Sequence, residues 1–118
     1  MTRAFKILSF QAAALVAGGL MMTTVSVSTH AAVAPAPTIV RIDNFSFNAP
    51  AVTIKAGTRV TWINGDDIPH TVVASNGAFK SKALDTDDRF SFTFAKPGEF
   101  SYFCSLHPHM TGKIVVKA

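Results

Sequence analysis

Short runs of alternating apolar and polar residues make up most of the chain after residue 38. The clearest run is Phe90 to Phe94, in which three phenylalanines alternate with Ser91 and Thr93. A period of two places every second side chain on the same face of a β-strand. Turn residues separate the runs, and no stretch has the period of a long amphipathic helix. The pattern predicts an all-β domain, either a sandwich or a barrel.

We predict seven to eight strands and find no internal repeat. Residues 75–88 are the least regular part of this domain and contain Asn76-Gly77 and three aspartates. We expect a solvated loop there, with partner docking as the alternative. The predicted strands are residues 39–43, 45–47, 52–55, 59–63, 70–74, 90–94, 100–103 and 113–117.

The first 31 residues have the features of a secretory signal peptide. Arg3 and Lys6 give a positive start, residues 12–22 form a short apolar run, and Thr29-His30-Ala31 offers small residues for cleavage after Ala31. The run is too short and too often interrupted by polar residues to be a good membrane span, so we expect no stable membrane association. An uncleaved anchor is the alternative. We therefore predict a signal peptide at 1–31, a flexible lead-in at 32–38 and a domain at 39–118, exported to the periplasm.

The charge of the chain excludes one class of partner. The formal net charge is +4, and removal of Arg3 and Lys6 leaves 9 basic and 7 acidic residues, a net charge of +2. No cluster of Lys and Arg is dense enough to indicate nucleic-acid binding.

Cys104 is the only cysteine, so a disulfide within the chain cannot reinforce this small domain. In an exported protein a lone cysteine is free and reactive, paired between chains, or held by a metal. A metal would protect the thiol from oxidation and stabilise the fold, because it binds the folded site better than the unfolded chain.

The segment around Cys104 carries further metal-binding side chains. His107 and Met110 follow Cys104 at spacings of three, and His70 lies upstream. Two imidazoles, a thiolate and a thioether suit a trigonal His₂Cys copper site with a weak axial Met. We therefore predict one copper ion per chain. Zinc is the alternative, since Cys and His also bind it, but Met is a poor zinc ligand.

Several neighbours could support these ligands. Asn64 lies six residues before His70 and could tie together the two loops that carry the ligands. Pro69 and Pro108 flank the two histidines and restrict their backbones. Gly112 would allow the chain to leave the site closely packed.

The chain resembles the small blue copper proteins, the cupredoxins, from about Ile39 to Val116. It is most similar to the amicyanins and related to pseudoazurin and plastocyanin, and its short spacing from His107 to Met110 is of the amicyanin type. The matching stretches are Val60-Thr61-Trp62-Ile63-Asn64, Pro69-His70, Phe92-Thr93-Phe94, Pro97-Gly98, and Tyr102 to Lys113.

The resemblance implies a Greek-key β-sandwich with type 1 copper near one end. It also implies that His107 is the exposed ligand and carries the electron through an apolar patch, which Ile68, Pro69 and Pro108 match. Together with His109 these residues form the expected docking patch. The implied function is the shuttling of single electrons between periplasmic redox proteins of dehydrogenase or cytochrome c type, which bind transiently to a monomer.

Two departures from the amicyanins leave the partner open. His109 and Thr111 stand where amicyanins have Phe and Arg, on the surface that meets methylamine dehydrogenase. His109 could give this surface a charge that depends on protonation.

Two other functions compete with electron transfer as interpretations of these residues. A copper-handling or tolerance protein is the alternative, but the chain lacks the Met- and His-rich cluster that such proteins favour. An enzyme is not expected, because a four-ligand site leaves no open position for a substrate and the other histidines are too few for further copper sites.

Overall fold

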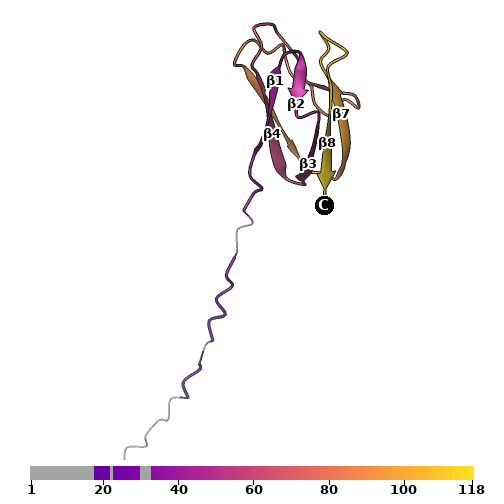
Figure 1. Cartoon of the computed structure of the whole chain (residues 1–118). Helices are drawn as coiled ribbons and strands as arrows, with labels where there is room; N and C mark the ends of the chain where they lie inside the picture. Colours follow the sequence, from indigo (N-terminus) through magenta and orange to yellow (C-terminus); the bar gives the residue numbers. More distant parts are fainter. Residues whose placement is uncertain (1–17, 22, 30–32) are drawn as a thin grey trace, which may run out of the picture. The chain divides into compact units, whose positions relative to one another are not determined.

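The structure, a computed structural model, describes residues 18–21, 23–29 and 33–118 (Figure 1). The chain divides into two units, Met1–His30 and Ala31–Ala118. Residues 18–21 and 23–29 of the first unit contain no helix or strand. Most of the predicted signal peptide, and its cleavage position at Ala31, lie outside the described residues. Within the described ranges, no helix combines the length and the apolarity needed to cross a membrane.

The second unit contains eight strands in two four-stranded sheets, which confirms the predicted all-β sandwich. One sheet has the order β2-β1-β4-β6 and the other the order β3-β8-β7-β5. The strands are β1 (Thr38–Asp43), β2 (Ser46–Asn48), β3 (Ala51–Lys55), β4 (Thr58–Asn64), β5 (Val73–Ala74), β6 (Arg89–Phe94), β7 (Gly98–Phe103) and β8 (Thr111–Lys117).

Each sheet joins one parallel and two antiparallel pairs. In the first sheet β4 pairs in parallel with β1 and antiparallel with β6, so that Trp62 lies opposite Phe90. In the second sheet β8 pairs in parallel with β3 and antiparallel with β7. The inner strands are therefore β1 and β4 in the first sheet and β8 and β7 in the second.

Trp62 is fully buried at the centre of the core, which lies between the sheets. Its ring packs edge to face on Tyr102, with ring centroids 5.4 Å apart, and close to Phe79 and Phe94. Such offset and edge-on arrangements are the favoured geometries of aromatic pairs. The strict alternation of β6 is confirmed in part, because Phe94 is buried while Phe90 and Phe92 are only partly buried against the core.

The predicted strand at 70–74 is shorter than expected, and only Val73–Ala74 forms β5. His70, Thr71 and Val72 are all buried, so this stretch does not alternate between two faces. Its backbone instead forms an isolated antiparallel bridge: His70 N donates to Leu84 O at 3.1 Å, and Leu84 N donates to His70 O at 2.7 Å.

Residues 75–88 are irregular as predicted, but the expectation of a solvated loop is wrong for part of the segment. Phe79 and Leu84 are only 5% and 1% exposed. The chain turns back at Gly77, whose φ is +78°, and Ala74 N donates to Phe79 O at 2.9 Å. The turn folds the segment onto the sandwich, where it covers part of the core.

The loop after β7 lies at the end of the sandwich away from the C-terminus (Figure 1). The chain leaves this loop through Gly112 of β8, which lies against the Tyr102 ring of β7. A Cβ atom at position 112 would overlap that ring, so glycine allows the close approach that the sequence predicted here.

Candidate metal centre

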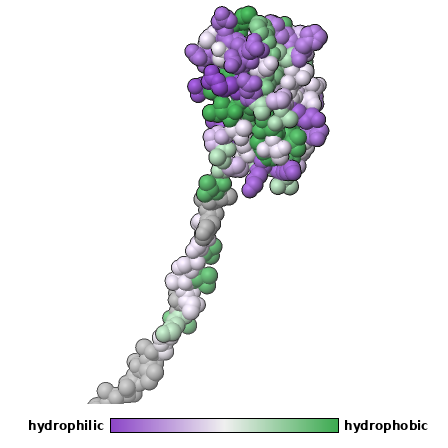
Figure 2. All heavy atoms as spheres, viewed as in Figure 1, coloured by the Kyte–Doolittle hydropathy of each residue, from purple (hydrophilic) through white to green (hydrophobic). Residues whose placement is uncertain are grey.

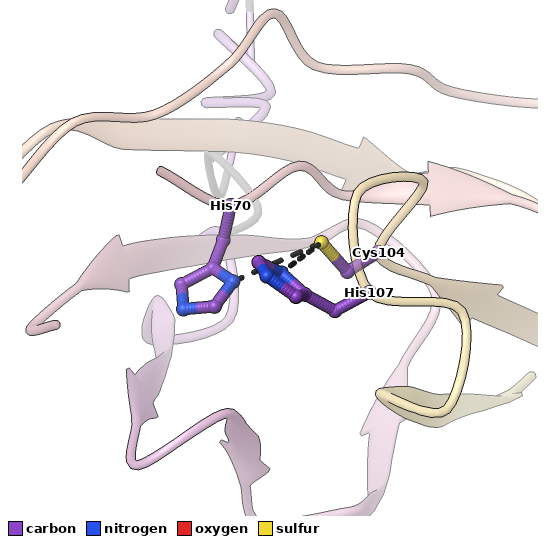
Figure 3. A group of neighbouring side chains, drawn as sticks. All are labelled: His70, Cys104 and His107. Atoms are coloured by element: carbon purple, nitrogen blue, oxygen red, sulfur yellow. Dashed lines mark hydrogen bonds between the residues drawn. The ribbon is translucent and has the colours of Figure 1, made fainter. Parts of the chain in front are cut away.

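Three side chains with metal-binding donor atoms converge in the structure: His70, Cys104 and His107. His70 Nδ1 lies 3.8 Å and His107 Nδ1 lies 3.7 Å from Cys104 Sγ. The three donor atoms all lie within 4.8 Å of one another. Figure 3 shows both imidazole rings with a nitrogen directed at the sulfur. His70 comes from the loop after β4, and Cys104 and His107 come from the loop after β7.

The loop from Cys104 to Met110 is closed by its own backbone. His107 N donates to Cys104 O at 3.3 Å, and Met110 N donates to His107 O at 2.9 Å. Cys104 N in turn donates to Met110 O at 3.0 Å. The spacings of three are therefore those of two successive turns, which bring Cys104 and Met110 next to each other. Both residues are buried.

The Cys104 thiol lies in surroundings that favour its ionised form. Burial acts to raise its pKa, but hydrogen bonds from the Thr71 N–H, the His70 and His107 rings and the backbone at Leu106 lower the pKa to about 6. The Thr71 N–H is 3.4 Å from the sulfur. Since the thiolate is the form of cysteine that binds metals, the site presents its sulfur in a competent state at neutral pH.

His70 is fully buried and held by a carboxylate. Its Nε2 lies 2.8 Å from Asp66 Oδ2. Partial burial acts to raise the Asp66 pKa, but hydrogen bonds from the backbone of Phe45, from His70 and from the backbone of Asn44 lower it below its usual value. An ionised carboxylate only accepts, so Nε2 carries the proton. Nδ1 faces Cys104, and its lone pair can bind a metal once any proton that it shares with the sulfur is displaced.

The link between the two ligand-bearing loops comes from a residue that the sequence did not indicate. In the described chain, the Asn64 side chain bonds to Ile68 O, Leu84 O and Asp66 N, so it braces the loop before His70 and makes no bond to the Cys104 loop. Thr71 makes the link, because its Oγ1 accepts from Ser105 N at 2.8 Å and lies 2.8 Å from Ser105 Oγ. The predicted bracing role of Asn64 is therefore different from the one observed.

All four residues of the expected docking patch are exposed: Ile68, Pro69, Pro108 and His109. His107 itself is partly exposed.

Two more exposed apolar side chains lie next to His107, one in sequence and one in space. Leu106 precedes it in the loop and is 51% exposed. Phe45 is 44% exposed, and its ring centroid lies 5.0 Å from that of His107 and 5.4 Å from that of His70, edge-on in both cases. Phe45 could not be identified from sequence, because it belongs to the alternating run Phe45-Ser46-Phe47, which indicated only a strand. Asp66 had a weak signal, as an acidic residue four positions before the buried histidine.

The donor set fits copper. Two imidazole nitrogens and a thiolate, with a buried thioether in the same loop, match the ligands of an electron-transfer copper site. The thioether sulfur of Met is a soft ligand, which copper accepts. Zinc instead favours nitrogen, oxygen and thiolate ligands.

Comparison with known proteins gives consistent matches. The family model for copper binding proteins of the plastocyanin/azurin family matches residues 36–117. Amicyanin of Paracoccus versutus is 38% identical over 84 residues, which are 67% of this chain and 64% of that protein. Amicyanin of Paracoccus denitrificans is 35% identical over 92 residues, 74% of this chain and 70% of that protein. The chain thus spans slightly less than two thirds of the first of these relatives.

Solved structures are also similar to this chain. A mutant of amicyanin with Cu(I) matches with a TM-score of 0.65 and 33% identity, over 73% of this chain and 87% of that one. A copper-containing nitrite reductase from Thermus scotoductus matches with a TM-score of 0.67 and 32% identity, over 76% of this chain but only 24% of that one. The likeness to the reductase therefore covers a small part of a larger protein.

Proposed function

Because the chain belongs to the plastocyanin/azurin family of copper binding proteins, we propose that it is a type 1 copper protein that carries single electrons between periplasmic redox partners. The observation that carries this proposal is the convergence of both Nδ1 atoms on Cys104 Sγ. In the proposal His70, Cys104, His107 and Met110 are the ligands. A bound copper ion would supply the one-electron couple between Cu(I) and Cu(II).

The burial of the ligands supports a carrier rather than an enzyme. His70, Cys104 and Met110 are 0%, 0% and 4% exposed, so no substrate can reach the site from their side. Among the ligands only His107 is partly exposed, and it lies between the exposed Leu106 and Pro108. We therefore assign the outer edge of the His107 ring as the port through which the electron enters and leaves.

The surroundings of this port suit a transient partner. The docking patch, Ile68, Pro69, Pro108 and His109, is exposed and carries no permanent charge. The visible face of the folded unit mixes hydrophilic and hydrophobic residues (Figure 2). A small patch that is largely apolar favours weak and short-lived encounters of the kind made by redox proteins. Residues 1–31 are proposed to export the chain to the periplasm, where those partners would be dehydrogenases or c-type cytochromes.

Optical and EPR spectra after addition of Cu(II) test the proposal. We expect an intense visible band from thiolate-to-copper charge transfer and a narrow copper hyperfine splitting, both lost in Cys104→Ser. The unmutated protein loaded with copper should show a reversible one-electron wave in voltammetry. It should also show fast electron self-exchange. A colourless protein, or ordinary tetragonal copper signals, would contradict the proposal and favour copper handling, which transfer of Cu(I) to an acceptor lacking copper would then test.

A further inference from the structure

The Asp66 carboxylate joins two parts of the chain that lie far apart in sequence. Its Oδ1 accepts from Asn44 N at 2.7 Å, and its Oδ2 accepts from Phe45 N at 2.9 Å. The same Oδ2 accepts from His70 Nε2 at 2.8 Å. The side chain is 11% exposed; its bond to His70 is partly buried, whereas the two bonds to the turn lie at the surface. One carboxylate thus holds both the turn between β1 and β2 and the ring of a metal-binding histidine.

The turn that Asp66 holds has an unfavourable backbone. Asn44 and Phe45 have φ values of +49° and +56°. Asn tolerates this left-handed region, but it is uncommon for a bulky residue such as Phe and persists only where the surroundings impose it. The two hydrogen bonds from consecutive N–H groups to Asp66 supply that constraint.

The conformation of the turn determines where the Phe45 ring lies. The Phe45 ring is nearly perpendicular to both histidine rings, with interplanar angles of 88° to His70 and 86° to His107. The two histidine rings are themselves 5.0 Å apart. The Phe45 ring therefore packs against both imidazole rings. The position of the Phe45 ring depends on Asp66, because Asp66 holds the turn.

We propose that Asp66 is a positioning residue of the metal centre: it fixes the tautomer of His70 and, through the Asn44–Phe45 turn, seats the Phe45 ring against both histidines. This proposal rests on the proposed function, because positioning the two histidine rings matters for electron transfer only if they bind copper. Asp66 touches no donor atom that faces Cys104, so it acts through His70 and Phe45.

The carboxylate also has an expected effect on copper. A charged acceptor on the outer nitrogen makes the inner nitrogen a stronger donor, which favours Cu(II) over Cu(I). Loss of such a partner typically lowers metal affinity by about 10- to 100-fold. For Asp66→Asn we expect the affinity for Cu(II) relative to Cu(I) to fall about tenfold, which corresponds to a reduction potential about 59 mV higher.

Asp67→Asn provides the matched control. Asp67 is the next residue, is exposed, and shows no hydrogen bond or ion pair with any other residue in the described ranges. Its substitution removes the same charge at a similar place without touching His70. The control should therefore shift the potential much less than Asp66→Asn.

Two readouts in the copper-free protein separate this proposal from the proposed function. An Asn side chain has only one acceptor oxygen, so in Asp66→Asn at least one of the Asn44 and Phe45 amides loses its partner. We expect hydrogen exchange of that amide to rise about tenfold, with no change in Asp67→Asn. In the unmutated protein, ¹⁵N NMR should show the proton of the His70 ring on Nε2.

The outcomes decide the proposal whether or not copper binds as expected. A His70 ring without a proton on Nε2 in the unmutated protein would overturn it, and this measurement needs no variant to fold. Equal exchange rates and equal shifts of potential in the two variants would overturn it as well. A protein that shows the Nε2 proton and the selective loss of amide protection, but no blue copper site, would support the role of Asp66 and contradict only the proposed function.

Discussion

At the scale of single residues, Met110 offers a direct test of the fourth ligand. Met110→Leu keeps most of the side-chain volume and leaves His70, Cys104 and His107 in place. We expect copper to bind still and the reduction potential to rise, because a weak donor that stabilises Cu(II) is lost. Each tenfold loss in preference for Cu(II) raises the potential by about 59 mV.

Voltammetry measures this shift, and Ile114→Leu, an equally conservative change at a buried position of β8, is the control. If Met110→Leu left both the potential and the visible spectrum unchanged, the axial assignment would be wrong.

Thr71 should hold the two ligand-bearing loops together. Thr71→Val removes the acceptor of the Ser105 N–H, whereas Ser105→Ala removes only the bond between the two hydroxyls. An unpaired buried donor costs about 1–3 kcal/mol; because the Ser105 N–H is only partly buried, we expect Thr71→Val to lower the free energy of unfolding by an amount toward the lower end of that range. Ser105→Ala should cost clearly less. Urea unfolding of both variants measures the difference, and equal losses would contradict the assigned link.

The proposed ligand residues could be identified from sequence because three of them share one short loop. Cys104, His107 and Met110 are three residues apart, and the backbone closes two successive turns over that spacing. Phe45 and Asp66 could not be assigned in the same way. Their roles depend on a turn and a loop brought together only when β1 pairs with β4. The sequence therefore indicated the donors but not the groups that orient them.

At the scale of elements, residues 75–88 should contribute to stability and not only cover the surface. Leu84→Ala removes a side chain that is 1% exposed, and its backbone neighbour across the bridge is His70. Loss of a buried Leu typically costs about 2–5 kcal/mol. Thermal unfolding should show this loss, whereas Lys82→Ala, at an exposed position of the same segment, should have little effect. A small effect of both changes would mean that the segment is a solvated loop after all.

The alternation of apolar and polar residues predicted the positions of most strands, but it did not predict where the strand near His70 begins. Residues 90–94 alternate because one face of β6 meets the core. His70, Thr71 and Val72 are instead buried together, since one side is covered by the Leu84 segment and the other by the Cys104 loop. A stretch covered on both sides has no reason to alternate, so its pattern suggested a strand that extends further than β5.

At the scale of the whole molecule, metal binding should stabilise this small domain. A ligand that binds only the folded state adds about 2.7 kcal/mol at a concentration 100 times its Kd. For a domain of this size we expect Tm to rise by roughly 10–20 °C when copper is added. Calorimetry with and without metal measures the rise, and Cys104→Ser should abolish most of it. An equal rise in that variant would show that the metal binds elsewhere.

An all-β domain was predictable from the strands, but the choice of a sandwich and the order of the strands in the sheets were not. The parallel pairs β1–β4 and β3–β8 join segments separated by long stretches of chain. Their register depends on which faces meet in the core, and such pairings leave no local pattern. The resemblance to the cupredoxins supplied the Greek-key arrangement that the alternation alone left open between a sandwich and a barrel.

The position of β8 has a consequence for how the domain folds. This strand lies between β3 and β7, so the second sheet has no continuous structure without Thr111–Lys117. A chain that lacks this strand cannot complete the sandwich, and we expect truncation before Thr111 to leave the domain unfolded.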